Sequence, residues 1–167
     1  MKFRNVAIVV GLFVSVLFSQ PLFAMSVADL RSAAESGDTD AQIELGLCYQ
    51  CGDGVTKDKA ESVKWYRKAA EQGNAKAQAL LGASYAFGEG VEKDPVEANK
   101  WFSKAAEQFR KAAEQGNAYA QFRLGNCYYN GQGVEKDKDE AVKWYRKAAE
   151  QGEKNAKNRL KDLGVTL

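Results

Sequence analysis

Few side chains of this 167-residue chain could carry out covalent or metal chemistry. Three cysteines are present, Cys48, Cys51 and Cys127, and there is no histidine. A chain without histidine lacks the most common general base and the most common metal ligand. Ser-His-Asp catalysis, Cys-His catalysis and zinc sites with histidine ligands are therefore excluded. No Ser-x-x-Lys motif of penicillin-recognising serine enzymes occurs either. We expect no catalytic residue, no metal site and no cofactor.

The cysteines fit a structural role better than a chemical one. Cys48 and Cys127 occupy the same place in two copies of an internal repeat, where the middle copy has Ser84, so we interpret them as small core residues. They lie two copies apart, which is too far for a disulfide bond. Cys48 and Cys51 are three residues apart on one expected helix, where a bridge would be strained. A redox pair or a two-thiolate metal site remain the alternatives for these two residues.

Paired glycines recur at three places and predict turns. They lie in Gly52-Asp53-Gly54, Gly88-Glu89-Gly90 and Gly131-Gln132-Gly133. A phosphate-binding loop would need a Lys followed by Ser or Thr at a set distance, and none follows here. Since glycine readily adopts left-handed backbone conformations, we interpret the three segments as tight turns that end a helix.

The turns belong to an internal repeat, which must position any functional residue. The sequence Val-Lys-Trp-Tyr-Arg-Lys-Ala-Ala-Glu-Gln-Gly occurs identically at 63–73 and 142–152. Marker glycines at Gly37, Gly73, Gly116 and Gly152 are spaced 36, 43 and 36 residues apart. The spacing predicts units at about 37–72, 73–115 and 116–151, with half-units at both ends of a domain spanning 25–167. A period of this length is typical of helical solenoids.

Each unit predicts two helices separated by the paired glycines. Good N-cap residues precede the first helix of each unit, at Asp38, Asn74 and Asn117. An aspartate followed three residues later by a glutamate predicts the start of each second helix, at Asp58, Asp94 and Asp137. Each second helix carries one tryptophan that we expect to be largely buried, at Trp65, Trp101 and Trp144.

The repeated pattern resembles the Sel1-like repeat family. Ala-Gln-x-x-Leu-Gly-x-x-Tyr-x-x-Gly-x-Gly-Val is followed by Asp-x-x-x-Ala-x-x-Trp-Tyr-x-Lys-Ala-Ala-x-Gln-Gly, at 41–73, 77–105 and 120–152. The resemblance implies an all-α fold, a right-handed α-solenoid of stacked helix-turn-helix repeats related to tetratricopeptide arrays. It also implies an adaptor or scaffold that binds other proteins.

Some cysteine-rich members of the family are linked to penicillin binding or β-lactamase activity, so a cell-wall-related enzyme is the alternative function. In those members a cysteine pair joins one repeat to the next. The matching positions here are Ala70 with Gln78 and Ala113 with Gln121. Because neither pair is cysteine, we do not expect that activity and predict that the chain is not an enzyme.

The middle unit is seven residues longer than the others, and a short duplication accounts for the difference. Lys104-Ala-Ala-Glu-Gln108 is echoed by Lys111-Ala-Ala-Glu-Gln115. Seven residues are nearly two helical turns, so the faces of a helix stay within about 20° of register. We expect one uninterrupted helix from Pro95 to Gln115, with Phe109 repeating the role of Phe102 and unit three displaced.

Positions that differ between the copies are free of the shared packing role. On the first helices they form one variable stripe, which includes the repeat position of Asp40, Lys76 and Tyr119. We expect the stripe to face the groove of the solenoid, and the alternative for its apolar members is contact with the neighbouring helix. Tyr and Arg are common in interface hot spots, and unit three has the most such residues in the stripe. We predict that the partner-binding residues are Phe87, Tyr119, Arg123, Asn126, Tyr129 and Asn130. The predicted ligand is a protein or peptide held mainly by units two and three.

The N-terminal 24 residues have the layout of a secretory signal peptide. Lys2 and Arg4 precede an apolar run from Val6 to Phe18, and the small Ala24 precedes a cleavage position. The run is too short for a membrane-spanning helix, which needs about 20 apolar residues. We expect a bacterial protein exported to the periplasm or secreted, with no stable membrane insertion after cleavage.

Removal of that segment changes the net charge of +2 to zero, with 22 basic and 22 acidic residues left. A neutral chain argues against nucleic acid or an anionic membrane surface as the main partner. The function predicted from the sequence is therefore an exported, non-enzymatic interaction module.

Overall fold

The computed structural model describes residues 26–166, which form eight α-helices and no strand. The helices are α1 (Val27–Glu35), α2 (Thr39–Cys51), α3 (Lys59–Glu71), α4 (Ala75–Phe87), α5 (Pro95–Glu114), α6 (Ala118–Asn130), α7 (Lys138–Glu150) and α8 (Lys154–Asp162). The expected signal peptide at 1–24 lies outside the described residues. Within 26–166, no helix combines the length and apolar character needed to cross a membrane.

The helices begin and end at the residues that the sequence predicts. The side chain of Asp38 accepts a hydrogen bond from the backbone N–H of Ala41, and Asp58 accepts one from Glu61. Equivalent caps begin the corresponding helices of units two and three, at Asn74, Asp94, Asn117 and Asp137. Gly52 ends α2 with a φ of 83°. Such a left-handed φ is strained for residues that carry a Cβ, so glycine suits this position.

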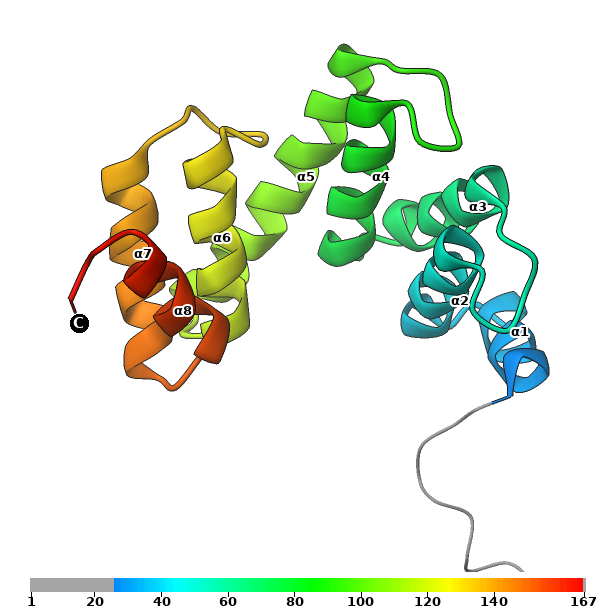
Figure 1. The fold of residues 1–167 in the computed structure, drawn as a ribbon, viewed down its shortest axis with the longest axis horizontal. Coiled ribbons are helices and arrows are strands. Elements are labelled where there is room, and N and C mark those ends of the chain that lie inside the picture. Colours follow the sequence, from blue (N-terminus) through cyan, green and yellow to red (C-terminus); the bar gives the residue numbers. More distant parts are fainter. Residues whose placement is uncertain (1–25, 167) are drawn as a thin grey trace, which may run out of the picture.

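Consecutive helices pack as antiparallel hairpins stacked into an α-solenoid (Figure 1). The pairs α2 with α3, α4 with α5 and α6 with α7 form the three units, and α1 and α8 cover the two ends. The outer side of α8 is polar and exposed, with Lys154, Asn155, Lys157 and Lys161. Polar end helices are what a repeat array needs to stay soluble at its termini.

Each hairpin is held closely together by a glycine that lies against an aromatic ring. A Cβ on Gly46 would lie 2.5 Å from the Tyr66 ring, and a Cβ on Gly125 would lie 2.6 Å from the Tyr145 ring. The middle unit repeats this contact between Gly82 and Phe102. The repeated glycines therefore serve the shared packing, because any side chain there would push the two helices apart.

Successive units are joined by buried hydrogen bonds that recur along the array. The Nε2 atom of Gln42 donates to the Ala34 carbonyl at 3.0 Å, and Gln78 and Gln121 make the equivalent bonds to Ala70 and Ala113. An arginine on one helix also donates to the tyrosine hydroxyl of the next, in the pairs Arg31–Tyr49, Arg67–Tyr85 and Arg110–Tyr128. The glutamine and tyrosine positions that are the same in all three units thus have structural roles.

The expectation of one buried tryptophan in each unit is confirmed for two units and wrong for the third. Trp65 is 3% exposed and Trp101 is 7% exposed, whereas Trp144 is only half-buried. Trp101 packs in a cluster with Ile43 and Val63. Trp144 packs at the edge of a cluster rich in alanines, which cover less of the indole ring because their side chains are small.

The seven extra residues of the middle unit extend α5 without interrupting it. α5 has 20 residues, whereas the other two second helices have 13. At a rise of about 1.5 Å per residue, α5 is about 10 Å longer than α3 or α7. The predicted uninterrupted helix is confirmed, and Gln115 follows it as the C-cap residue.

Candidate functional site

The long helix α5 offers two sets of contacts, and units two and three use different ones. Gly82 of unit two lies against Phe102, as Gly46 lies against Tyr66. In unit three, Gly133 contacts the backbone of Phe102, whereas in unit two Gly90 contacts the backbone of Lys59. Lys59 is the first residue of α3, but Phe102 is the eighth residue of α5. Unit three therefore packs seven residues further along its supporting helix than unit two does.

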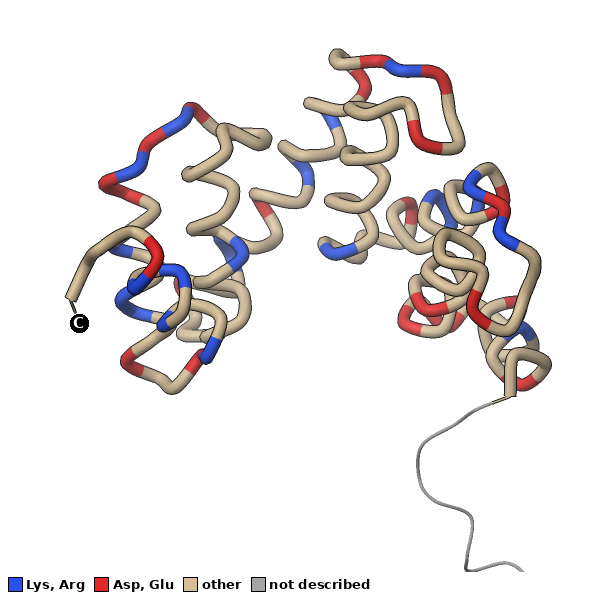
Figure 2. Tube along the Cα trace, viewed as in Figure 1, with Lys and Arg blue, Asp and Glu red and all other residues tan. Residues whose placement is uncertain are grey.

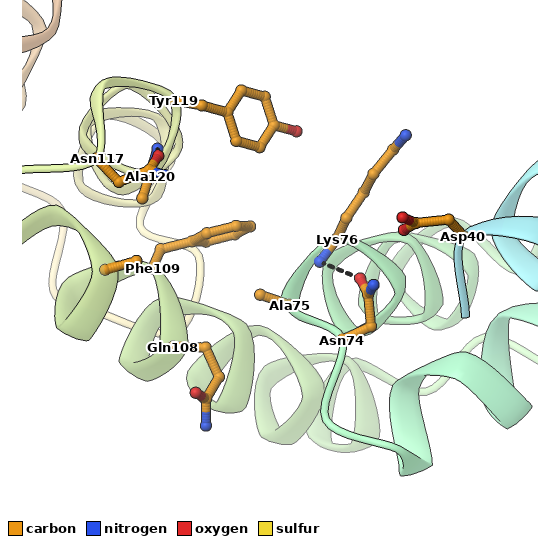
Figure 3. Close-up of a pocket in the computed structure, with 10 residues that line it drawn as sticks. Asp40, Asn74, Ala75, Lys76, Gln108, Phe109, Asn117, Tyr119 and Ala120 are labelled. Atoms are coloured by element: carbon orange, nitrogen blue, oxygen red, sulfur yellow. Dashed lines mark hydrogen bonds between the residues drawn. The ribbon is translucent and has the colours of Figure 1, made fainter. Parts of the chain in front are cut away.

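This shift leaves a cleft between the beginnings of α4 and α6. Its volume is about 330 Å³, and its floor consists of Phe109 and Ala112 of α5 with Ala75 of α4. Tyr119 of α6 forms one wall and Lys76 of α4 the other, with Asp40 of α2 beyond it (Figure 3). Between units one and two the equivalent helix ends are tied together. There the Asn74 Nδ2 atom donates to the Thr39 Oγ1 atom at 3.4 Å.

Two of the predicted binding residues meet at this cleft. Tyr119 lines it and is 44% exposed, an unusually high value for a large aromatic side chain in this chain. The Arg123 guanidinium lies 5.9 Å from the centre of the Tyr119 ring and 5.5 Å from that of Phe109. The arginine thus lies near both rings of the cleft, in an arrangement suited to cation–π contact.

The backbone at the cleft also favours negative charge. α4 and α6 both begin there, and neither has an acidic residue in its first turn. By contrast, α2 carries Asp40 in its first turn. A helix N-terminus has a partial positive charge. Two such ends, with no acidic residue in their own first turns, therefore add to the charge of Lys76, and Asp40 of α2 is the one carboxylate on the lining of the cleft.

The other four predicted binding residues lie elsewhere. Phe87, which is 73% exposed, and Asn130, which is exposed, are the last residues of α4 and α6, at the ends away from the cleft. The Asn126 Oδ1 atom accepts a hydrogen bond from the Tyr145 hydroxyl at 2.8 Å. Tyr129 is half-buried beneath Arg159, whose guanidinium lies 4.7 Å from its ring centre. Asn126 and Tyr129 are thus engaged in contacts within the solenoid.

The cleft contains residues that the sequence-based prediction did not select. Asp40 and Lys76 belong to the variable stripe on the first helices, so variation between the repeats does mark them as candidates. Phe109 is recognisable as an additional aromatic residue only through the duplication in α5. The duplication itself predicts that unit three is displaced relative to unit two, and the cleft between α4 and α6 lies at that displacement.

A smaller cavity of about 200 Å³ occupies the matching place between α1 and α2. Five of its six lining residues occupy the repeat positions of residues that line the cleft: Leu30 matches Phe109, Ala33 matches Ala112, Asp38 matches Asn117, Asp40 matches Tyr119 and Ala41 matches Ala120. Glu44, which also lines the smaller cavity, occupies the repeat position of Arg123. The surface along the starts of α2, α4 and α6, called the groove below, therefore has two related depressions with different chemistry.

The lengthened helix also leaves one buried polar atom without its usual partner. The Gln72 Nε2 atom donates to Gln42 Oε1 at 2.9 Å, and Gln151 donates to Gln121 in the same way at 2.7 Å. Gln108 stands at the matching distance from Gln78, but it lies inside α5 and is exposed. Among the described residues, the buried Gln78 Oε1 atom has no hydrogen-bond partner.

The three cysteines are free thiols in different surroundings. Cys127 is buried, and burial raises its pKa from 9.0 to about 11. Cys48 is half-buried, with a pKa raised by burial and by the nearby Asp53, and Cys51 is exposed. Residues 26–166 contain no group of three or more cysteine or acidic side chains placed to hold a metal ion. The core role expected for Cys127 is confirmed, whereas Cys48 is only partly covered.

Comparison with known proteins identifies the repeat. The family model described as "Sel1 repeat" matches residues 39–74, 75–108, 109–117 and 118–153. The crystal structure of a Sel1 repeat protein from Oxalobacter formigenes is 45% identical, with a TM-score of 0.54. That match covers 81% of this chain and 97% of the other.

Two further structures are similar over most of this chain. Cysteine-rich protein B of Helicobacter pylori is 27% identical with a TM-score of 0.46, covering 82% of this chain and 98% of its own. A protective antigen of uropathogenic Escherichia coli with an SLR fold is 37% identical with a TM-score of 0.49, covering 80% of this chain and 35% of its own. No curated protein shows significant similarity to the chain.

Proposed function

The chain belongs to the Sel1 repeat family, and from that premise we propose that it is a non-enzymatic module that binds a protein or peptide at the cleft between α4 and α6. Sel1 repeat proteins generally mediate protein interactions. The proposal adds a location to that general role, at the junction where the long helix separates units two and three.

The observation that carries the proposal is the cleft itself, where Tyr119 is exposed beside the buried ring of Phe109. Tyr119 is one of three large hydrophobic residues that are exposed among the described residues, and it stands over the Phe109 and Ala112 floor. Tyrosine and arginine are enriched at interface hot spots because they combine a large apolar contact area with hydrogen bonding. Tyr119 and Arg123 supply both residue types at one place.

The ligand contacts predicted from the sequence are narrowed by this geometry. We propose Tyr119 and Arg123 as the primary contacts, with Lys76 and Phe109 added to them. Phe87 and Asn130 contribute only to a ligand long enough to run along α4 and α6 to their far ends. Asn126 and Tyr129 support the site through their contacts within the solenoid.

A binding experiment with matched variants tests the location. The tagged chain is used to isolate a partner from a periplasmic extract, and the affinity for that partner is then measured by calorimetry. The double variant Tyr119→Ala with Arg123→Ala is expected to lose binding, with the helical circular dichroism unchanged. Lys157→Ala, on the outer side of α8, is the control and is expected to keep binding. Retained affinity in the double variant would assign binding to the convex charged face instead.

We also propose that the chain is exported before it binds its partner. This rests on the sequence of residues 1–24, which has the layout of a signal peptide. Expression of the full chain in a bacterium, followed by intact-mass measurement of the periplasmic fraction, is expected to show a product that begins near Met25. A full-length product in the cytoplasm alone would contradict export.

A further inference from the structure

The two depressions of the groove differ in charge although they are built alike. Repeat positions that are Asp38, Asp40 and Glu44 in unit one are Asn117, Tyr119 and Arg123 in unit three. The smaller cavity between α1 and α2 is therefore acidic. The cleft is bordered by Arg123, by Lys76 and by two helix N-termini without acidic residues in their first turns, with Asp40 as its one acidic lining residue.

The acidic and basic parts adjoin each other. Asp40 lines both depressions, and Lys76 stands beside it on the wall of the cleft (Figure 3). Along the chain trace, the start of α2 is coloured as acidic and the start of α4 as basic (Figure 2). The charge along the groove therefore changes from negative at the start of α2 to positive at the start of α4. This pattern fits a ligand whose own charge changes sign along its length.

The charged groups concerned are available to a ligand. Within residues 26–166, none of the ion pairs involves Asp40, Glu44, Lys76 or Arg123. Asp40, Glu44 and Lys76 are exposed, and Arg123 is partly exposed. Salt bridges elsewhere in the chain join neighbours on one helix or tie two units together, as Lys59 and Glu89 do at 2.9 Å.

Building on the proposed function, we propose that the groove recognises the charge polarity of an extended peptide segment. The segment places a large apolar side chain on Phe109 and Ala112, and a carboxylate next to it meets Lys76, Arg123 and the helix ends. A basic residue further along the segment meets Asp38, Asp40 and Glu44. The cleft volume of about 330 Å³ is enough for one large side chain but is at the small end of ligand pockets.

The same charges disfavour a nucleic acid as the occupant. A phosphate backbone needs a continuous positive surface. In this groove, a phosphate backbone that extends beyond Lys76 and Arg123 would meet the three carboxylates of the adjoining cavity. Opposite charges at the two ends also fix the direction in which a peptide lies, since the reversed peptide would place like charges together.

Selection from a random peptide library identifies the preferred chemistry directly. The probe is a library of phage-displayed random dodecapeptides, selected on the purified chain, with the enriched peptides then synthesised and measured by fluorescence polarisation. Enriched peptides are expected to share an acidic residue beside a large apolar residue, with a basic residue several positions away. Replacing that acidic residue with its amide is expected to weaken binding about tenfold.

Two charge reversals in the protein complete the test. Lys76→Glu is expected to lower the affinity for the acidic peptides about tenfold, and Glu44→Lys is expected to lower it by a smaller factor. An acidic residue in the first turn of α4 suits the helix dipole, so Lys76→Glu should fold normally. Lys157→Glu, on the outer side of α8, is the control and is expected to change nothing.

The outcomes separate this inference from the proposed function. If enriched peptides lose binding in Tyr119→Ala but share no acidic residue and tolerate Lys76→Glu, the cleft binds peptides and the charge-polarity inference is wrong. If no peptide is enriched, or if binding tolerates Tyr119→Ala, the proposed location is wrong and the inference fails with it.

Discussion

The junction between units one and two and the junction between units two and three use the same residue types at different spacing. At the first junction, Tyr66 of α3 serves both neighbours. Its ring lies against Gly46 of its own unit, and it shares a cluster with Leu81 of the next. At the second junction the two tasks are divided. Phe102 lies against Gly82, and Phe109 packs in a cluster with Leu124 of the next unit.

The comparison shows that a helix can move two interfaces apart without turning them away from each other. Seven residues return a helix to within about 20° of the same face, while they lengthen it by about 10 Å. The contacts of unit three are therefore preserved in kind, as in Arg110 with Tyr128, and displaced in position. The cleft is the volume that this displacement leaves unfilled.

The largest expected effect tests whether the second junction is packed less completely than the first. Trp101→Ala is expected to lower the free energy of unfolding by about 3–5 kcal/mol, because it empties a buried site at the first junction, where Trp101 packs with Ile43 and Tyr66. Trp144→Ala is expected to cost clearly less, since the ring is half-buried against alanines. Urea unfolding followed by circular dichroism measures both. Equal losses would mean that the second junction is as tightly packed as the first.

Removing the extra heptad should convert the second junction into the first. Deletion of residues 102–108 joins Trp101 directly to Phe109 and restores the order found after Trp65. We expect α5 to shorten from 20 residues to the 13 of α3 and α7, and the cleft to close. Binding at the cleft should be lost, whereas the change in stability should stay within about 2 kcal/mol.

A shorter deletion provides the control for this experiment. Deleting only residues 106–108 would rotate unit three by about 60° relative to α5, because three residues do not complete a turn. This variant is expected to lose the cooperative unfolding of units two and three. If it is as stable as the heptad deletion, helical register does not govern the junction.

A smaller effect is expected from the glutamine pairs. Gln72→Ala leaves the buried Gln42 Oε1 atom without its donor and is expected to cost about 1–2 kcal/mol. Gln108→Ala, at the matching place of the middle unit, removes no hydrogen bond to Gln78 and is expected to be nearly neutral. Thermal unfolding of the two variants side by side distinguishes them. A matching loss in Gln108→Ala would show that it does pair with Gln78 in solution.

The smallest effect concerns Cys127, which belongs to the cluster at the second junction. Because burial raises its pKa to about 11, the unfolded thiol ionises at lower pH than the folded one. Its contribution to stability is complete below about pH 9 and is lost as the pH rises towards 11. Cys127→Ser should therefore show a shallower decline in stability over this range than the unsubstituted chain. Parallel declines would mean that the thiol is not buried in solution.

The sequence predicts much of the fold because each helix end carries its own signal. Asp58 and Asp94 as caps, Gly52 as a terminator and the duplication before Gln115 each act locally, and the structure confirms them. The burial of Trp144 could not be predicted in this way. It depends on the size of residues on α5 that meet it only after the solenoid is assembled.

The candidate site was predictable only in part for the same reason. Variation between copies singles out residues without a shared packing role, which includes Tyr119 and Arg123. It also selects Asn126 and Tyr129, since a residue that contacts one particular neighbour varies between copies just as a ligand contact does. Neither composition nor spacing shows that Phe109 forms the floor of a cleft.

In mechanical terms, α5 supports two other helices at separate points along its length. α4 packs along its first part and α6 along its last part. The tie that Thr39 provides between the starts of α2 and α4 is lacking at the matching place, where the residue is Ala75. The width of the cleft therefore depends on how far a single helix bends, and long helices bend gently over their whole length. A ligand seated on Phe109 would bind against the bending stiffness of α5. Residues that stiffen or soften α5 would therefore change which ligands fit the cleft.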